Sequence, residues 1–159
     1  MDPLLKLLRQ NALESTGNLA RMLNVPEAEV KARIAEYERS GVIRAYQAIV
    51  NEDQLDLDRV RAVIEVKITP EREGGFDRIA SRISKFPEVE AMYLMSGAYD
   101  LLVFVRGRNL KEVAGFVSER LATIAGVLST STHFMLKTYK EQGVAMTQEK
   151  ENERLAVSP

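Results

Sequence analysis

The spacing of apolar residues changes once along this chain, and the change divides it into two parts. Before residue 50, apolar residues recur every three or four positions, as on one face of a helix. From Val60 onward, stretches with a two-residue period, typical of half-buried strands, alternate with helical stretches. A length of 159 residues suits one large domain or two small ones, and the change of spacing favours two. We therefore predict a helical domain at 1–50, a linker at 51–59, a second domain at 60–142 and a mobile polar tail at 143–159.

Three short amphipathic helices are predicted in the first domain. Their buried faces comprise Leu4, Leu5 and Leu8, then Leu19, Ala20 and Leu23, and finally Val30, Ile34 and Tyr37. Ser15 is placed to cap the second helix, and Asn24 with Glu27 to form a capping box that opens the third. The third helix is expected to reach Ser40, where Gly41 ends it. Two helices joined by about four residues match a helix-turn-helix, whose second helix lies in the DNA major groove.

The residues opposite the buried stripe of the third helix are the candidates for DNA contact. With flanking positions, the predicted DNA-binding residues are Arg21, Glu27, Ala28, Lys31, Ala32, Arg33 and Arg44. Lys31 and Arg33 suit phosphate or guanine contacts, and Arg21 and Arg44 suit flanking phosphates. The alternative is that these are ordinary solvated charges on a small helical bundle. Glu27 and Glu29 are ambiguous, because a carboxylate stabilises a helix N-terminus but repels phosphates.

The charge of the first domain gives only weak support for DNA binding. Residues 1–50 contain two Lys and five Arg against one Asp and five Glu, a net charge of +1, in a chain with a net charge of −1. Affinity for duplex DNA normally requires several phosphate-neutralising cations. Binding would therefore depend on several copies acting together.

The second domain is predicted to contain strands and helices in the order β-α-β-β-α-β. Strands are expected at 60–69, 89–95, 101–105 and 127–139, and helices at 76–86 and 110–124. Residues 101–105 are apolar throughout, as expected for a central strand. This order is that of a ferredoxin-like domain. The predicted fold class is α+β, with a helix-turn-helix of the winged type followed by a ferredoxin-like βαββαβ domain.

One face of the predicted sheet carries both helices, which leaves the other face open. Val63 lies on that open face, with Met92, Leu94 and Met95 as further candidates depending on register. Apolar side chains on an open sheet face are normally covered. Dimerisation through the sheets is the simplest way to cover them.

Short motifs across both domains resemble the Lrp/AsnC family, the "feast/famine" regulators. They are Leu19-Ala20, Val30 with Arg33-Ile34, Gly41-Val42-Ile43 with Tyr46, Ser96-Gly97-Ala98-Tyr99-Asp100-Leu101, Gly126-Val127 and Thr130-Ser131-Thr132. The resemblance covers about residues 4–140. It implies a DNA-binding regulator of transcription, a homodimer that assembles further into an octamer or another set of dimers, and control by an amino acid or related small metabolite.

The resemblance also implies where the effector binds. The matching positions are Gly97, Ala98, Tyr99, Asp100, Thr130, Ser131 and Thr132. Gly97 permits a close backbone approach, free amides of the turn can hold a carboxylate, and Asp100 can accept from an α-ammonium group. The alternative is that Gly97 serves a hairpin turn and Asp100 caps its own backbone.

Other functional classes are disfavoured by what the sequence lacks. It has no cysteine, no apolar stretch long enough to cross a membrane and no secretory signal, so we expect a cytoplasmic protein. Some relatives of this layout are haem-pathway decarboxylases that use histidines, but His133 is the single histidine here. We expect no catalytic residues, metal or cofactor. A metabolite-sensing or architectural assembly with little specific DNA binding is the second hypothesis, and the decarboxylase the third.

Overall fold

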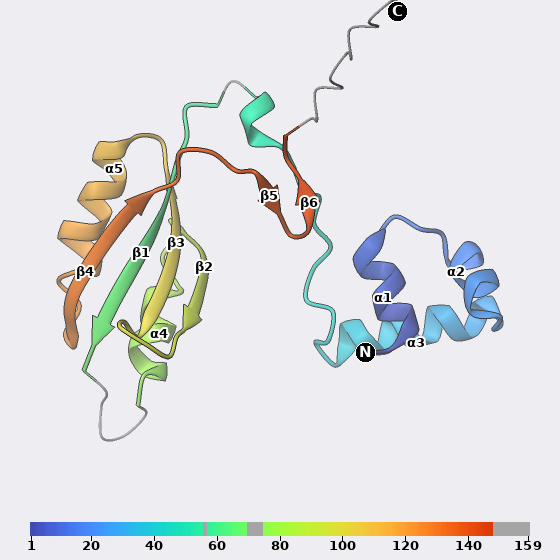
Figure 1. Cartoon of the computed structure of the whole chain (residues 1–159). Coiled ribbons are helices and arrows are strands. Elements are labelled where there is room, and N and C mark those ends of the chain that lie inside the picture. The colour runs from blue at the N-terminus through green and yellow to red at the C-terminus, as the bar shows by residue number, and fades with distance from the viewer. Residues whose placement is uncertain (56, 70–74, 148–159) are drawn as a thin grey trace, which may run out of the picture. The chain divides into compact units, whose positions relative to one another are not determined.

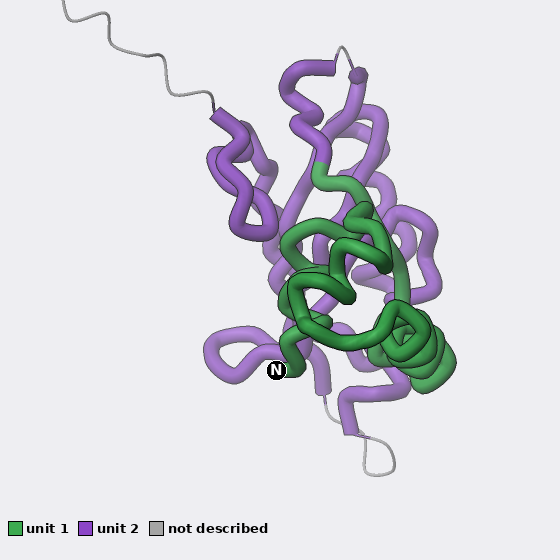
Figure 2. Tube along the Cα trace, turned by 90° about the vertical axis from the view of Figure 1, so that its right-hand side faces the viewer, with its two compact units in different colours: residues 1–49 green, residues 50–159 purple. Residues whose placement is uncertain are grey.

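The computed structural model describes residues 1–55, 57–69 and 75–147. The chain divides into two compact units, Met1–Ile49 and Val50–Pro159, which Figure 2 colours separately. The boundary falls one residue before the predicted end of the first domain. Within the described residues, no helix combines the length and the apolar character needed to cross a membrane.

The first unit consists of three helices around a small apolar core. The helices are α1 (Pro3–Gln10), α2 (Thr16–Leu23) and α3 (Glu27–Arg39). The backbone amide of Asn18 donates to Ser15 Oγ at 3.1 Å, which confirms Ser15 as the cap of α2. Leu4, Leu19 and Val30 are fully buried, one from each helix. The predicted three-helix arrangement is confirmed.

The start of α3 differs from the prediction. Asn24 adopts a left-handed conformation with φ 54° and ends α2, and Pro26 precedes α3 without a side-chain cap. The predicted capping box between Asn24 and Glu27 is therefore wrong. Residues 42–49 follow α3 without forming a strand, so residues 1–49, all of which are described, contain no β-wing.

The second unit is a four-stranded antiparallel sheet with helices on one face (Figure 1). Its elements are β1 (Val60–Ile68), α4 (Asp77–Ile83), β2 (Val89–Leu94), β3 (Leu101–Gly107), α5 (Leu110–Gly115) with a π-helical turn at Phe116–Leu121, and β4 (Val127–Phe134). The strand order is β2-β3-β1-β4. The predicted β-α-β-β-α-β order is confirmed, with the first and third strands in the centre.

The core of this unit lies between the sheet and its helices. Alternate residues of β1, beginning with Ala62 and Ile64, are buried and lie opposite alternate residues of β3 such as Val103. The turn before β4 packs directly on α4, since a Cβ added to Gly126 would lie 2.5 Å from Ile79 Cδ1. Gly126 also has φ +94°, so both space and backbone conformation require glycine here.

The open face of the sheet carries an apolar patch. We define this patch as Val63, Tyr93, Leu102 and Phe104. The rings of Tyr93 and Phe104 meet edge to face with centroids 6.0 Å apart. The prediction for Val63 is confirmed, whereas Met92 lies opposite Val103 and packs against the core instead.

Ion pairs enclose one end of that open face. Arg61 lies 3.3 Å from Glu90 and 3.6 Å from Glu141, and Arg106 pairs with Glu90 and, at 3.1 Å, with Glu52. These pairs tie β1, β2 and β3 to segments before and after the sheet. They form a charged border beside the apolar patch.

The predicted linker and tail boundaries need correction. Glu52–Gln54 forms a 3-10 turn, and Asn51 Nδ2 donates to the Met146 carbonyl at 2.6 Å, so the first part of the linker packs on the second unit. The last sheet strand ends at Phe134 rather than at residue 139. Two short strands, β5 (Lys140–Glu141) and β6 (Val144–Ala145), then form a hairpin. The tail therefore does not begin at residue 143, and residues 148–159 lie outside the described residues.

Candidate DNA-binding helix and effector site

One face of α3 packs on the first unit and the opposite face is exposed. Val30 is buried, and Ile34 and Tyr37 pack against the same core. The exposed face carries Ala28, Lys31, Ala32, Ala35 and Arg39. Three of these side chains are single methyl groups at helical spacing. Such a face lets a helix backbone come close to a partner surface, with cations available at its sides.

Glu27 joins the two helices of the motif. Its carboxylate accepts from Thr16 Oγ1 in α2 at 2.7 Å and lies 2.8 Å from Lys31 Nζ. The hydrogen bond from Lys31, and then the one from Thr16, lower the pKa of the Glu27 carboxyl below its ordinary 4.5. Glu27 therefore has a structural role at the start of α3.

The predicted cations of this unit differ in whether they already have hydrogen-bond or ion-pair partners within it. Arg33 is half-buried and pairs with Asp2 and, at 3.8 Å, with Glu29, so its guanidinium already has partners inside the unit. Arg21 donates to Asn18 and lies beside an open hollow of about 400 Å³ at the α2–α3 turn. Arg44 is exposed.

Two further residues of the exposed α3 face were not among the predicted contacts. Ala35 and Arg39 lie seven and eleven positions after Ala28, on the same side of the helix. Arg39 forms an exposed pair with Glu36. Extending the helical spacing from Ala28 along the sequence would have identified both.

The predicted effector loop between β2 and β3 is fixed to the end of β1. Asp100 accepts a hydrogen bond from the Ile68 amide through Oδ2 at 2.8 Å, and its own amide donates to the Val66 carbonyl at 3.0 Å. Gly97 has φ +144° in this loop. Asp100 thus caps the backbone of a neighbouring strand rather than its own. Its other carboxylate oxygen, Oδ1, accepts no bond from the described part of the chain.

The predicted hydroxyls of β4 do not all lie on one face. Thr130 pairs opposite Val66, Ser131 opposite Glu65 and Thr132 opposite Ile64. Thr130 and Thr132 share the side of the sheet that carries the helices, and Ser131 lies on the open side. Asp100 and Thr130 come to the same end of β1, from the strands on either side of it.

His133 lies on the open side of β4. Its Nε2 is 3.5 Å from Glu65 Oε1 and 3.4 Å from Ser131 Oγ. Among the described residues, no group of three or more His, Asp or Glu side chains is placed to hold a metal ion.

Comparison with known proteins identifies the family. Residues 61–145 match the model described as the Lrp/AsnC ligand binding domain. The HTH-type transcriptional regulator YugG of Bacillus subtilis is 43% identical over 98% of this chain and 95% of its own length. The chain belongs to the Lrp/AsnC family. The regulator LysM of Saccharolobus solfataricus is 32% identical over 86% of this chain and 91% of its own.

Solved structures of other proteins share the fold. MtbAldR matches with a TM-score of 0.74 and 20% identity, over 88% of this chain and 97% of that one. Escherichia coli AsnC matches with a TM-score of 0.67 and 21% identity, over 89% and 95%. The regulator NMB0573 of Neisseria meningitidis, solved as a complex with L-Met, gives 0.70 and 22%, over 91% and 95%. The resemblance and the α+β fold predicted from the sequence are confirmed, and this Lrp/AsnC member is a transcriptional regulator.

Proposed function

We propose that this chain binds double-stranded DNA through α3 and regulates transcription in response to an amino acid or related metabolite. The observation that carries the DNA-binding part is the exposed α3 face. Ala28, Ala32 and Ala35 leave room for the helix in the major groove, where alanine methyls can contact thymine methyls. Lys31 and Arg39 flank these positions and can contact phosphates.

The weak charge of the first unit is compatible with this role if copies act together. Lys31 and Arg39 are paired with Glu27 and Glu36 on the same helix. Both pairs are exposed, and exposed pairs contribute little stability, so the cations can exchange a carboxylate for a phosphate. Each copy then supplies few phosphate contacts, and a dimer supplies twice as many.

Loss of both cations should weaken DNA binding and its salt dependence together. For Lys31→Ala/Arg39→Ala we expect affinity for a chromosomal fragment selected by the unmodified chain to fall at least about tenfold. Each lost phosphate contact should lower the slope of log affinity against log salt concentration by about 1. Salt titrations by fluorescence anisotropy measure both quantities.

The matched control for this test is Lys111→Ala/Lys137→Ala, which removes two exposed cations of the second unit. It should leave the salt slope unchanged. A slope for Lys31→Ala/Arg39→Ala equal to that of the unmodified chain would show that another face meets DNA. Absence of DNA binding by the unmodified chain, even at low salt, would favour the metabolite-sensing assembly.

We further propose that subunits pair through the apolar patch on the open sheet face and that the dimers assemble further, as an octamer or another set. The patch is apolar, partly exposed and bordered by charges, as expected of a self-complementary contact. A DNA-bound regulator works where the chromosome is, so we place it in the cytoplasm. The named relatives are regulators, and we propose no catalytic role for His133 and no cofactor.

For the effector we propose the end of the sheet where the 97–100 loop meets β1 and β4. Gly97 exposes loop backbone that can hold a carboxylate, and Asp100 Oδ1 is available for an ammonium group. Thr130 adds a hydroxyl from the other side of β1. The NMB0573 complex shows that a protein with this fold binds an amino acid.

Asp100→Asn separates the structural role of Asp100 from effector binding. The asparagine oxygen can still accept from the Ile68 amide, while the charge that attracts an ammonium group is lost. We expect an unchanged melting temperature and binding of the effector amino acid weakened about tenfold or more. Calorimetric titration with individual amino acids, beginning with L-methionine, measures the affinity. Asp77→Asn, at the start of α4, is the control, and equal affinity in Asp100→Asn would assign the ammonium group to another residue.

A further inference from the structure

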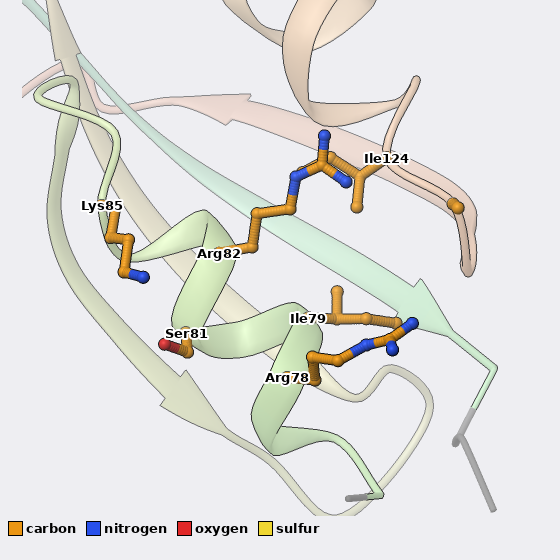
Figure 3. A pocket seen from close by; sticks show the side chains of 7 residues that line it. Arg78, Ile79, Ser81, Arg82, Lys85 and Ile124 are labelled. Atoms are coloured by element: carbon orange, nitrogen blue, oxygen red, sulfur yellow. The ribbon is translucent and has the colours of Figure 1, made fainter. Parts of the chain in front are cut away.

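A groove on the helical side of the second unit lies outside both proposed sites. It has a volume of about 440 Å³ and lies between α4 and the turn that leads into β4. Figure 3 shows Arg82 extending from α4 toward Ile124, with Arg78 beside Ile79. Neither α3 nor the 97–100 loop contributes to its lining.

The groove depends on one close contact, between Gly126 and Ile79. Gly126 lets the turn approach α4 until its Cα hydrogen faces Ile79, and its carbonyl accepts from the Thr69 amide at 2.8 Å. The turn is thereby held between α4 and the end of β1. Ile79 and Ile124, both nearly fully buried, form an apolar floor under the groove.

Basic side chains line the groove, and none of the described residues that line it is a carboxylate. Arg78 and Arg82 lie one turn apart on α4, and Lys85 follows in the turn after the helix ends at Ile83. Arg82 and Lys85 form no hydrogen bond or ion pair within residues 1–55, 57–69 and 75–147. Arg61, Arg106 and Arg120 of the same unit, unlike Arg82 and Lys85, are paired with glutamates.

Cations line this groove in a chain whose net charge is −1. Arg82 lies in the last turn of α4, where a cation favours the helix dipole. The dipole does not explain why Arg82 and Lys85 border a groove with an apolar floor while neither has a partner among the described residues. An anion bound beside Arg82 would neutralise its charge there.

We propose that the groove binds a small organic anion. Arg82 would hold its phosphate or carboxylate group through paired N–H donors, with Lys85 as a second cation. The apolar part of the ligand would rest on Ile79 and Ile124. This site does not depend on the proposed DNA and effector sites, and it would give the regulator a second small-molecule input.

Phenyl phosphate is a suitable probe because it combines a phosphate with one apolar ring. Titration of the full chain, with isoleucine methyls observed by NMR, should shift the signals of Ile79 and Ile124. Inorganic phosphate should bind more weakly, since it has no apolar part. In Arg82→Ala/Lys85→Ala the affinity for phenyl phosphate should fall at least about tenfold, because charge-assisted hydrogen bonds are lost. Lys111→Ala/Lys137→Ala removes the same charge elsewhere and should bind as the unmodified chain does.

Three results would overturn the proposal. The first is no shift of either isoleucine methyl at millimolar phenyl phosphate. The second is an equal loss of affinity in the control variant, which would indicate unspecific attraction to net charge. The third is intact phenyl phosphate binding in Arg82→Ala/Lys85→Ala together with a lower salt slope for duplex DNA, which would assign these cations to the phosphates of DNA.

Discussion

Replacing Leu19 by alanine is expected to unfold the first unit while the second remains folded. Leu19 is fully buried in a core of only five buried residues, Leu4, Leu8, Leu19, Ala20 and Val30. A buried leucine-to-alanine change costs about 2–5 kcal/mol. Domains of this size have little stability to spare, so the loss approaches the whole free energy of unfolding.

Hydrogen exchange followed by NMR tests this expectation in the full chain. Amides of α1, α2 and α3 should lose protection, while those of β1 and β3 keep it, and DNA binding should disappear. Met22→Ala is the matched control, because Met22 lies on the same helix and is 61% exposed. Loss of protection in β1 together with α2 would show that the two units unfold as one.

Replacing Phe104 by aspartate is expected to separate the subunits. Phe104 lies in the middle of the apolar patch, opposite Val63 on β1 and against the Tyr93 ring. In a dimer paired through this face, the new carboxylate would be buried without a partner, which costs about 3–5 kcal/mol. The dimer dissociation constant should therefore rise more than about a hundredfold.

Sedimentation velocity at micromolar concentration measures the change, and circular dichroism checks that the sheet remains folded. Leu110→Asp is the control, because Leu110 is exposed at the start of α5, in the helical layer. If Phe104→Asp sediments as the unmodified chain does, the subunits meet through another surface. If it becomes a monomer, its DNA affinity should fall as well, because each subunit carries few free cations.

The sheet was predictable because its burial follows local spacing. In β1 a two-residue period separates buried Ala62, Ile64 and Val66 from the open side, and the structure reproduces it. The apolar run 101–105 predicted a central strand correctly. The run also includes Leu102 and Phe104, which lie half-buried on the open face. Its continuous apolar character therefore reflects a surface patch as well as the core.

Features that depend on distant partners were missed. Glu27 bonds to Thr16, eleven residues earlier, and Arg33 pairs with Asp2, thirty-one residues earlier, and no local pattern indicates either contact. The β5–β6 hairpin was overlooked because its strands are two residues long. Its turn is formed by Gln142 and Gly143, which both adopt positive φ. In the sequence, Gly143 is the sign of this turn. Gly143 therefore marked a turn within the domain rather than its end.

The hydrogen bond that holds Asn51 to the second unit limits how far α3 can lie from that unit. The backbone amide of Ile43 donates a hydrogen bond to the Tyr37 carbonyl, which holds Ile43 to the first unit. The Asn51 side chain donates to the Met146 carbonyl, which holds Asn51 to the second unit. Only residues 44–50 remain between these two anchors, and the eight residue-to-residue steps from Ile43 to Asn51 span about 28 Å when fully extended. This segment keeps α3 within that distance of the second unit of the same chain. If the subunits pair as proposed, the half-sites of an operator must fall within the span that two such segments permit.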